Sequence, residues 1–265
     1  MKIINFYKKL GETPKEAIER LRKEKPEYKD SRLTYAGRLD PMAEGVLLIL
    51  EGDYTEANKL EVLKLPKQYY FEVLWGFKSD TFDILGIPEK GKTGMVDQTK
   101  LDQALLEIKN LKEISYPPFS SKTLNGIPLF KLAREGKLDK SKIPTRDINI
   151  FSLIKVKDFE ISPEDLLKLV RERIFLVAGD FRQKETEKKW SQILSNSKDR
   201  HLRSSELQRT EEIFSVSCFR AEVSTGTYIR SLANRMGEML GTGALCLKIV
   251  REKVGEYKMG ESHWI

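Results

Sequence analysis

Apolar and polar positions along the chain predict a mixture of strands and helices. Residues 45–52 (GVLLILEG) form a continuous apolar run of strand length, which is typical of a strand buried on both faces. Residues 69–77 alternate between large apolar side chains and more polar neighbours, which predicts a half-buried strand. Three further segments have strand-like composition: 151–159, 173–178 and 214–223.

Helices are predicted where apolar residues recur at helical spacing beside capping residues. Thr13-Pro14-Lys15-Glu16 forms a capping box with Pro at the first helical position, and Lys25-Pro26 ends that helix. Residues 228–240 place their apolar side chains on one face, and Gly241 follows as a C-terminal cap. Other helices are expected near 101–111, near 129–135, after 162 and near 187–194. Without a regular βαβ order or repeats, this mixture predicts the α+β class.

Composition narrows the class of protein. The 265 residues carry 47 Lys and Arg against 40 Asp and Glu, a net charge of +7, which is a weak indication of polyanion binding. No apolar run reaches the ~18 residues of a membrane span, and the first residues lack a signal-peptide pattern. Two cysteines and two histidines, all far apart, make no zinc signature. We therefore expect a reduced, cytoplasmic protein that needs no metal and does not enter the membrane.

Two stretches carry concentrated charge. Residues 182–209 hold eight Lys or Arg and four acids, which fits a solvated surface and a phosphate-contacting surface equally well. Residues 86–93 (GIPEKGKT) match the Walker A pattern, but the preceding strand ends near Phe77, Pro88 removes an N–H, and Gly94 stands where a helix should continue. A hairpin loop is favoured there over a nucleotide site.

Three short motifs could carry chemistry. In 37–45 (GRLDPMAEG), Asp40 stands on a turn, where it either caps the backbone or lies at the floor of a cleft that substrate approaches across the flanking glycines. In 224–230 (STGTYIR), Thr227 can cap a helix, and Tyr228 and Arg230 could hold a base and pair with a carboxylate. In 67–70 (KQYY), one tyrosine should pack and the other should point into the cleft.

Together these segments resemble the TruB family of tRNA pseudouridine synthases. The resemblance is carried, in order along most of the chain, by KKLGETP, GRLDPMAEGVL, KQYYFEV, DTFDILG, PPFSSKTLNGIPLFKLAREG, STGTYIRSLANRMGEMLGTGA and IVREKV. It implies the pseudouridine synthase fold, a mixed, largely antiparallel central sheet with flanking helices. Residues 1–265 would form a single catalytic domain, with 182–210 as a basic inserted or divergent segment and without an appended C-terminal RNA-binding domain.

The same resemblance implies an isomerase that converts uridine to pseudouridine in the TΨC loop of tRNA, acting as a monomer without a cofactor. Asp40 would be the catalytic aspartate, Tyr69 would lie against the target base, and Arg230 would pair with the catalytic carboxylate. The remaining site residues would contact the substrate, by stacking, by lining the uridine pocket or by hydrogen bonding: Tyr35, Tyr228, Ile249 and Asp83. Tyr35 stands near the usual family histidine, and Lys8-Lys9 replaces the family Lys-Pro.

Other functions compete with this interpretation. Arg38-Leu39-Asp40 also resembles the RLD motif of synthases that modify ribosomal RNA, but the GTYIR and PPFSSK segments favour tRNA. A non-catalytic RNA-binding scaffold of the same fold would not need Asp40, Tyr69 and Arg230 together. A P-loop NTPase is the weakest alternative.

Overall fold

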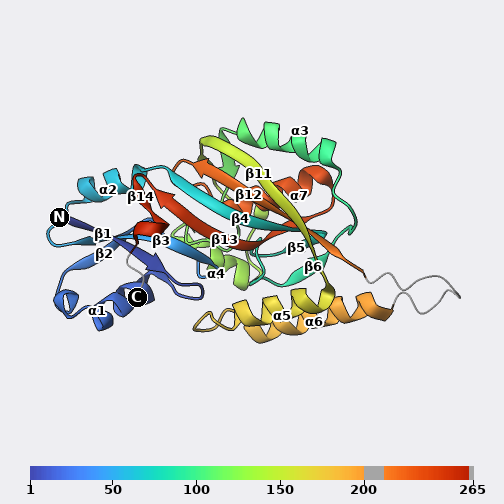
Figure 1. Cartoon of the computed structure of the whole chain (residues 1–265), viewed down its shortest axis with the longest axis horizontal. Coiled ribbons are helices and arrows are strands. Elements are labelled where there is room, and N and C mark those ends of the chain that lie inside the picture. Colours follow the sequence, from blue (N-terminus) through green and yellow to red (C-terminus); the bar gives the residue numbers. More distant parts are fainter. Residues whose placement is uncertain (200–211, 263–265) are drawn as a thin grey trace, which may run out of the picture.

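A central mixed sheet organises the computed structural model, which describes residues 1–199 and 212–262 (Figure 1). Its strands are β1 (Lys2–Lys8), β2 (Leu33–Ala36), β3 (Ala43–Glu51), β4 (Lys67–Trp75), β11 (Ile150–Ile161), β12 (Phe214–Val223), β13 (Ala244–Val254) and β14 (Tyr257–Lys258). They lie in the order β1-β3-β13-β4-β12-β11, with β2 paired to β3 and β14 to β13. Only the β3–β13 pair of these is parallel, so the expectation of a largely antiparallel sheet is confirmed.

Among the described residues, three two-stranded antiparallel sheets accompany the central sheet. They are β5 (Phe77–Ser79) with β6 (Pro88–Lys90), β7 (Glu113–Ser115) with β10 (Thr145–Asp147), and β8 (Thr123–Leu124) with β9 (Ile127–Pro128). The 3₁₀ turns are η1 (Pro26–Tyr28), η2 (Lys140–Lys142) and η3 (Met259–Glu261). The helices are α1 (Pro14–Glu24), α2 (Glu56–Lys64), α3 (Gln98–Lys109), α4 (Leu129–Arg134), α5 (Pro163–Ile174), α6 (Gln183–Asp199) and α7 (Ile229–Leu240).

Helices cover both faces of the sheet. Helices α3 and α7 pack on one side, where Leu101 and Leu232 join Phe71 and Trp75 of β4 in a buried cluster. Helices α5 and α6 lie together along the other side (Figure 1), where Trp190 packs beside Leu74 of β4. The sheet is therefore the middle layer of a three-layer arrangement, and its central strands are buried on both faces.

The apolar run of residues 45–52 is buried because a helix packs on each face of β3. Leu47 and Ile49 of β3 pack in a cluster with residues of α1, while Val46 and Leu48 pack with Val62 of α2. Alternate side chains of one strand thus meet a helix on each face. The prediction of a strand buried on both faces is confirmed.

Several predicted elements are confirmed, with boundaries set by local chemistry. The capping box of α1 forms between Thr13 and Glu16. Helix α7 ends at Gly241, whose φ of +70° is the left-handed cap conformation. The strand predicted at 69–77 is interrupted at Gly76, which has a φ of +79°, so Phe77 begins β5 instead of continuing β4.

The strand predicted at 173–178 is wrong. Helix α5 begins after Ser162, whose side chain accepts a hydrogen bond from Asp165, and it continues to Ile174. The buried residues of α5 at positions 166, 170 and 174 recur at helical spacing. The first residues of the predicted strand therefore end the helix, and the others form the turn after it. The sequence also left β1, β13 and α2 without a prediction.

Only part of the basic segment lies within the described residues. Its first part forms α6, while residues 200–210 lie outside the described chain. The interpretation of 1–265 as a single domain, with 182–210 as an insertion, stays a prediction.

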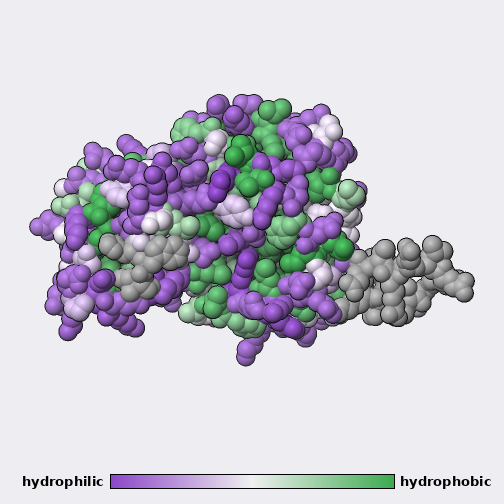
Figure 2. All heavy atoms as spheres, in the orientation of Figure 1, coloured by the Kyte–Doolittle hydropathy of each residue, from purple (hydrophilic) through white to green (hydrophobic). Residues whose placement is uncertain are grey.

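Hydrophilic side chains dominate the face seen in Figure 2, and apolar side chains emerge between them over the middle of the molecule. Within residues 1–199 and 212–262, none of the helices combines the length and the apolar composition needed to cross a bilayer.

Candidate active site

The loop that carries Asp40 connects β2 to β3 and is held by a buried arginine. Arg251 of β13 donates from Nε to the Val46 carbonyl (2.6 Å), and its Nη1 and Nη2 donate to the Arg38 (3.1 Å) and Gly37 (3.4 Å) carbonyls. Its side chain is almost completely buried. One guanidinium therefore fixes the backbone just before Asp40 against the sheet.

Gly45 allows a close contact between two strands of the sheet. The sequence suggested that glycines beside Asp40 allow a close approach by substrate, but Gly45 pairs in parallel with Arg251. A Cβ at Gly45 would lie 2.3 Å from the Arg251 carbonyl oxygen, and the backbone has a φ of +111°. This glycine is required for the contact between β3 and β13, which sets the position of the loop.

Asp40 forms an ion pair with Arg230, which stands 190 residues later in the chain. Arg230 Nε lies 2.8 Å from Asp40 Oδ2, and the exposed fractions of the two side chains are 4% and 36%. The other guanidinium nitrogens donate to the carbonyls of Thr81 (Nη1, 2.5 Å) and Phe119 (Nη2, 3.3 Å). Arg230 is thus buried and fixed in direction, while the carboxylate that it holds remains accessible.

Asp83 lies beneath the same guanidinium. Its Oδ2 is 3.6 Å from Arg230 Nε, and its Oδ1 accepts hydrogen bonds from the Thr81 hydroxyl (2.5 Å) and the Leu85 N–H (3.0 Å). Burial raises the pKa of Asp83, against the opposing effect of Arg230. Burial by itself lowers the pKa of Arg230, but the charges of Asp40 and Asp83 outweigh it and raise that pKa, so the guanidinium stays protonated.

One tyrosine lies beside the ion pair, and a second tyrosine packs against the first. Tyr228 immediately precedes α7, and its ring packs edge-on against Tyr116 with centroids 5.7 Å apart. Arg230 lies 6.0 Å from the Tyr228 ring centroid. The capping role predicted for Thr227 is wrong, because Tyr228 occupies the N-cap position and the Thr227 hydroxyl donates to the Ser224 carbonyl.

Tyr69 and Ile249 lie on the side of the sheet that faces the Asp40 loop. Both are buried in one cluster with Leu39 and Ala43, and Ile249 pairs directly with Ala43 across the β3–β13 ladder. Tyr70 is absent from this cluster of described residues, and its hydroxyl donates to Glu72. Of the two adjacent tyrosines, Tyr69 therefore shares a face with the candidate site.

Tyr35 is placed differently from the other predicted site residues. It lies on β2 opposite Ile49, and its side chain packs against the cluster formed by β1, β3 and α1. That cluster is separate from the one around Asp40. The structure thus brings Asp40, Arg230, Asp83 and Tyr228 together, puts Tyr69 and Ile249 beside their loop, and leaves Tyr35 on the α1 side of the sheet.

Sequence reasoning missed several residues that shape the site. Lys8 is fully buried, and its ammonium donates to the carbonyls of Ala43 (2.6 Å) and Lys9 (2.9 Å). Burial lowers the pKa of Lys8 to about 7, although the nearby acids, Asp40 among them, oppose this. Arg251 could have been suspected from a charge inside the apolar run IVREKV, whereas nothing in the sequence singled out Tyr116.

The Walker A match does not form a phosphate loop. Residues 88–90 form β6, which pairs with β5 in a hairpin. The next helix, α3, begins only at Gln98, so no helix starts at Lys92-Thr93. The segment belongs to a hairpin, as predicted, but residues 88–90 form its second strand and not its loop.

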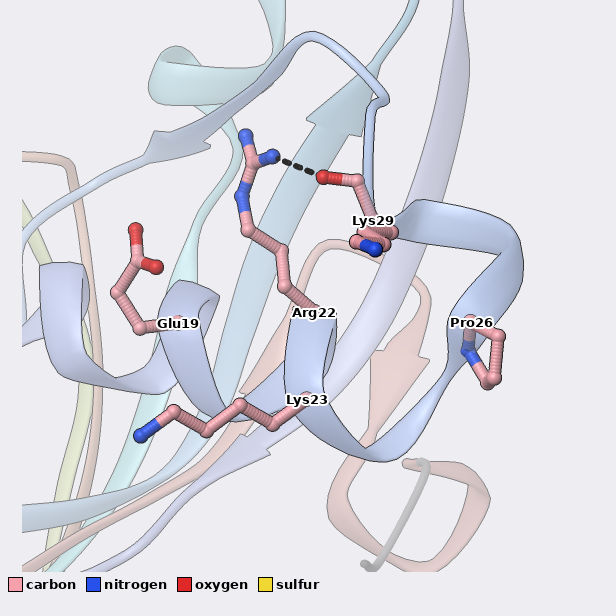
Figure 3. A pocket seen from close by; sticks show the side chains of 5 residues that line it. All are labelled: Glu19, Arg22, Lys23, Pro26 and Lys29. Atoms are coloured by element: carbon pink, nitrogen blue, oxygen red, sulfur yellow. Dashed lines mark hydrogen bonds between the residues drawn. The ribbon is translucent and has the colours of Figure 1, made fainter.

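A pocket on the surface of α1 and η1 is unrelated to these residues (Figure 3). It is lined by Glu19, Arg22, Lys23, Pro26 and Lys29. Arg22 reaches across it to the Lys29 carbonyl (2.8 Å) and also donates to the Ser31 carbonyl (2.9 Å). Arg22 therefore closes the connection between α1 and β2.

The sequence is similar to those of known pseudouridine synthases. The family model described as TruB family pseudouridylate synthase (N terminal domain) matches residues 25–166. Two relatives, both named tRNA pseudouridine synthase B, are 28% identical over 264 residues (Thermosipho melanesiensis) and 29% identical over 261 residues (Thermotoga petrophila). These alignments cover 99% and 98% of this chain but 66% and 65% of the relatives. The chain thus spans slightly less than two thirds of their length.

Solved structures share the fold. The structure titled "Crystal Structure of a Cbf5-Nop10-Gar1 Complex" matches with a TM-score of 0.54 at 18% identity, covering 97% of this chain and 49% of that one. "Structure of H/ACA RNP bound to a substrate RNA containing 2'-deoxyuridine" matches with a TM-score of 0.50, also at 18% identity, over 97% of this chain and 48% of that one. At this identity, the likeness concerns the arrangement of strands and helices.

Proposed function

Because the chain belongs to the TruB family of pseudouridylate synthases, we propose that it converts uridine to pseudouridine in the TΨC loop of tRNA. The observation that carries this proposal is the ion pair of 2.8 Å between an accessible Asp40 and a buried Arg230. The names of the relatives, tRNA pseudouridine synthase B, support tRNA as the substrate. The net charge of +7 agrees with an RNA partner.

The reaction defines what the site must supply. Pseudouridine formation breaks the N1–C1′ bond, rotates the uracil and joins C5 to C1′. All atoms come from one nucleotide, nothing is oxidised and no phosphate is consumed, so the reaction requires no cofactor. It does require an ionised carboxylate near C1′, a pocket that retains the detached base, and a group that manages the C5 proton.

Asp40 is the proposed carboxylate. As in glycoside cleavage, a carboxylate can stabilise or attack an electron-poor C1′. Asp40 either attacks C1′ or removes a sugar proton to give a glycal, and both routes use the same group. Arg230 binds one carboxylate oxygen from a buried and rigid position, which directs Asp40 toward the substrate.

The remaining predicted residues would handle the base. Tyr69 would abut the uracil and help to remove the C5 proton, while Tyr228 and Ile249 would line the pocket. Asp83 would act near the target nucleotide by holding Arg230 and the loop above it. Tyr35, on β2, would contact RNA outside the pocket. Extrusion of the target base costs a few kcal/mol of unstacking, which contacts with these side chains would offset.

The basic segment is proposed to assist binding. Seven Lys or Arg, those within residues 184–209, would contact backbone phosphates beyond the target loop. Such contacts would make affinity for tRNA fall with salt concentration, without changing which uridine is modified.

Incubation with unmodified tRNA and with ribosomal RNA, followed by sequencing for pseudouridine, tests the proposal. Product in the TΨC loop is expected from the parent protein. Asp40→Asn should abolish product while RNA binding persists, and Arg230→Lys should also be severe because lysine lacks the planar fork. Asp53→Asn, a change at a fully exposed aspartate, is the matched control and should leave activity unchanged.

Each other outcome rejects a defined part of the proposal. Product only in ribosomal RNA would favour the alternative synthase, and RNA binding without product would favour a scaffold. Activity of Asp40→Asn within about tenfold of the parent would remove Asp40 from the mechanism.

A further inference from the structure

The two carbonyl groups that orient Arg230 belong to separate segments of the chain. Thr81 lies in the connection between β5 and β6, and Phe119 lies between β7 and β8. A single side chain from a third segment contacts both places. Arg182, at the beginning of α6, places Nη1 2.8 Å from Asp80 Oδ2, and its guanidinium carbon lies 4.7 Å from the Phe119 ring centroid.

We propose that Arg182 is a positioning residue for the Asp40–Arg230 pair. It joins the residue before Thr81 to the side chain of Phe119, and so fixes the two carbonyls that receive the Arg230 guanidinium. This inference rests on the proposed function. It gives the start of the basic segment a role inside the protein, in addition to any contact with RNA.

Arg182 is itself held in place. Its backbone has a φ of +62°, a conformation that costs a residue with a side chain roughly 1–2 kcal/mol. Its N–H donates to Asp180 Oδ1 (3.1 Å), and the Asp180 carboxylate also pairs with Arg134. Gln183 donates from Nε2 to two carbonyls of the same turn, at 2.8 and 2.9 Å. An unfavourable backbone conformation stabilised by so many bonds indicates that the direction of this side chain matters.

Helix α6 fixes this turn relative to the loop before β6. The Thr186 hydroxyl donates to the Leu85 carbonyl (3.1 Å), and Trp190 Nε1 donates to the Ile84 carbonyl (3.3 Å). Both donors are fully buried, and the Trp190 ring lies 5.2 Å from that of Phe77. The helix therefore holds the far end of the loop, and Arg182 holds the near end.

The loop has internal bonds, so Arg182 is needed mainly for its link to Phe119. Asp80 Oδ1 accepts a hydrogen bond from the Ile87 N–H (2.9 Å), which joins the two ends of the loop to each other. Two side chains contact both this loop and the Phe119 segment. Arg230 donates to one carbonyl in each, and Arg182 binds Asp80 and lies over the Phe119 ring. Without Arg182 the two carbonyls could move apart, and a misplacement of about 1 Å at a catalytic group can cost as much as 10²-fold in rate.

Single-turnover kinetics on unmodified tRNA test the role. Arg182→Ala should lower the rate at saturating enzyme about tenfold or more, and leave the half-saturating concentration within about twofold. Arg182→Lys, which keeps the charge beside Asp80, should recover part of the rate. Arg171→Ala is the matched control, because Arg171 of α5 pairs with Glu187 of α6 and its side chain is 51% exposed. It should change neither quantity.

A double-mutant cycle separates this role from general damage. Asp80→Asn preserves an acceptor for the Ile87 N–H but weakens the pair with Arg182. If Arg182 acts through Asp80, the two changes together should cost less than the product of their separate effects. Multiplicative losses would overturn the proposal, as would an unchanged rate in Arg182→Ala. A raised half-saturating concentration at an unchanged saturating rate would show instead that Arg182 contacts RNA.

A spectroscopic measurement does not depend on activity. The ¹⁵N resonance of Arg230 Nε, assigned by its loss in Arg230→Lys, reports the bond to Asp40. Its hydrogen exchange should become at least about tenfold faster in Arg182→Ala and remain unchanged in Arg171→Ala. Equal exchange in all three proteins would overturn the positioning role. If the parent protein forms no pseudouridine, the proposed function fails, and this measurement still decides the role of Arg182.

Discussion

Replacing Arg230 with methionine removes the charge at the centre of the site and keeps most of the side-chain volume. The change leaves Asp83 buried without its cation, and removes the donors to the carbonyls of Thr81 and Phe119. Removing one partner of a buried ion pair costs about 3–5 kcal/mol of unfolding free energy. Asp40 contributes little to this loss, because its side chain is 36% exposed and water can solvate it. We therefore expect a loss of about 3–5 kcal/mol at neutral pH.

The loss should depend on pH in a defined direction. Burial already raises the pKa of Asp83 above its ordinary value of 3.8, and removing Arg230 raises it further. The folded variant then holds a proton that the unfolded chain has released, so its stability falls as pH rises above about 4. The difference between parent and Arg230→Met should be smaller at pH 5 than at pH 8. Asp83→Asn combined with Arg230→Met should recover part of the loss.

Urea denaturation at both pH values provides the measurement. Arg220→Met is the control, since Arg220 pairs with Glu252 near the surface of the sheet and should cost no more than about 1 kcal/mol. The reasoning is refuted if Arg230→Met costs no more than this control. A loss that is equal at pH 5 and pH 8 would show that Asp83 is not the group that bears it.

Two further predictions concern the frame of the Asp40 loop. Burial lowers the pKa of Lys8 to about 7 and that of Lys67 to about 8, so between these values and about pH 10 the unfolded chain binds protons that the folded chain lacks. The free energy of unfolding should therefore rise with pH in this range, by at most about 1.4 kcal/mol per pH unit for each lysine. In urea titrations, Lys8→Met should remove the Lys8 contribution and leave that of Lys67. Gly45→Ala should lower the free energy of unfolding by more than about 3 kcal/mol in urea denaturation, because a Cβ there would lie 2.3 Å from the Arg251 carbonyl oxygen. Gly52→Ala is the control: Gly52 also has a positive φ but no atom within 4 Å of the added Cβ, so the loss should be about 1–2 kcal/mol. Equal losses would contradict the proposed need for close strand contact.

The elements that the sequence predicted well are those defined by local patterns. The capping box of α1, the C-terminal glycine of α7 and the doubly buried β3 each depend on residues within one segment. The failures have equally local causes. At 173–178, apolar residues at the end of α5 imitate a strand, because a short apolar run fits a strand and a buried helix end equally well.

The site itself could be predicted only in part. The resemblance of GRLDP and GTYIR to a family suggested that Asp40 and Arg230 meet, and the structure brings them within 2.8 Å. The pattern of residues does not reveal that Lys8 is buried, and for Arg251 it offers no more than a charge inside an apolar run. Both side chains satisfy their donors with backbone carbonyls, which leave no trace in the sequence. Asp83 was predicted as a site residue, but its contact with Arg230 was not, because that contact depends on the turn that contains Asp83.

The order of strands explains why this site needs nearly the whole chain. Asp40 comes from the connection before β3, while Arg230 and Arg251 come from α7 and β13, about 200 residues later. Because β13 lies between β3 and β4, the loop can close on Arg251 only after the last long strand has entered the middle of the sheet. Arg230 then binds the side chain of Asp40, and Arg251 binds the backbone that precedes it. The candidate catalytic group is thus oriented only in the completed fold, at the cost of contacts of high sequence separation that slow folding.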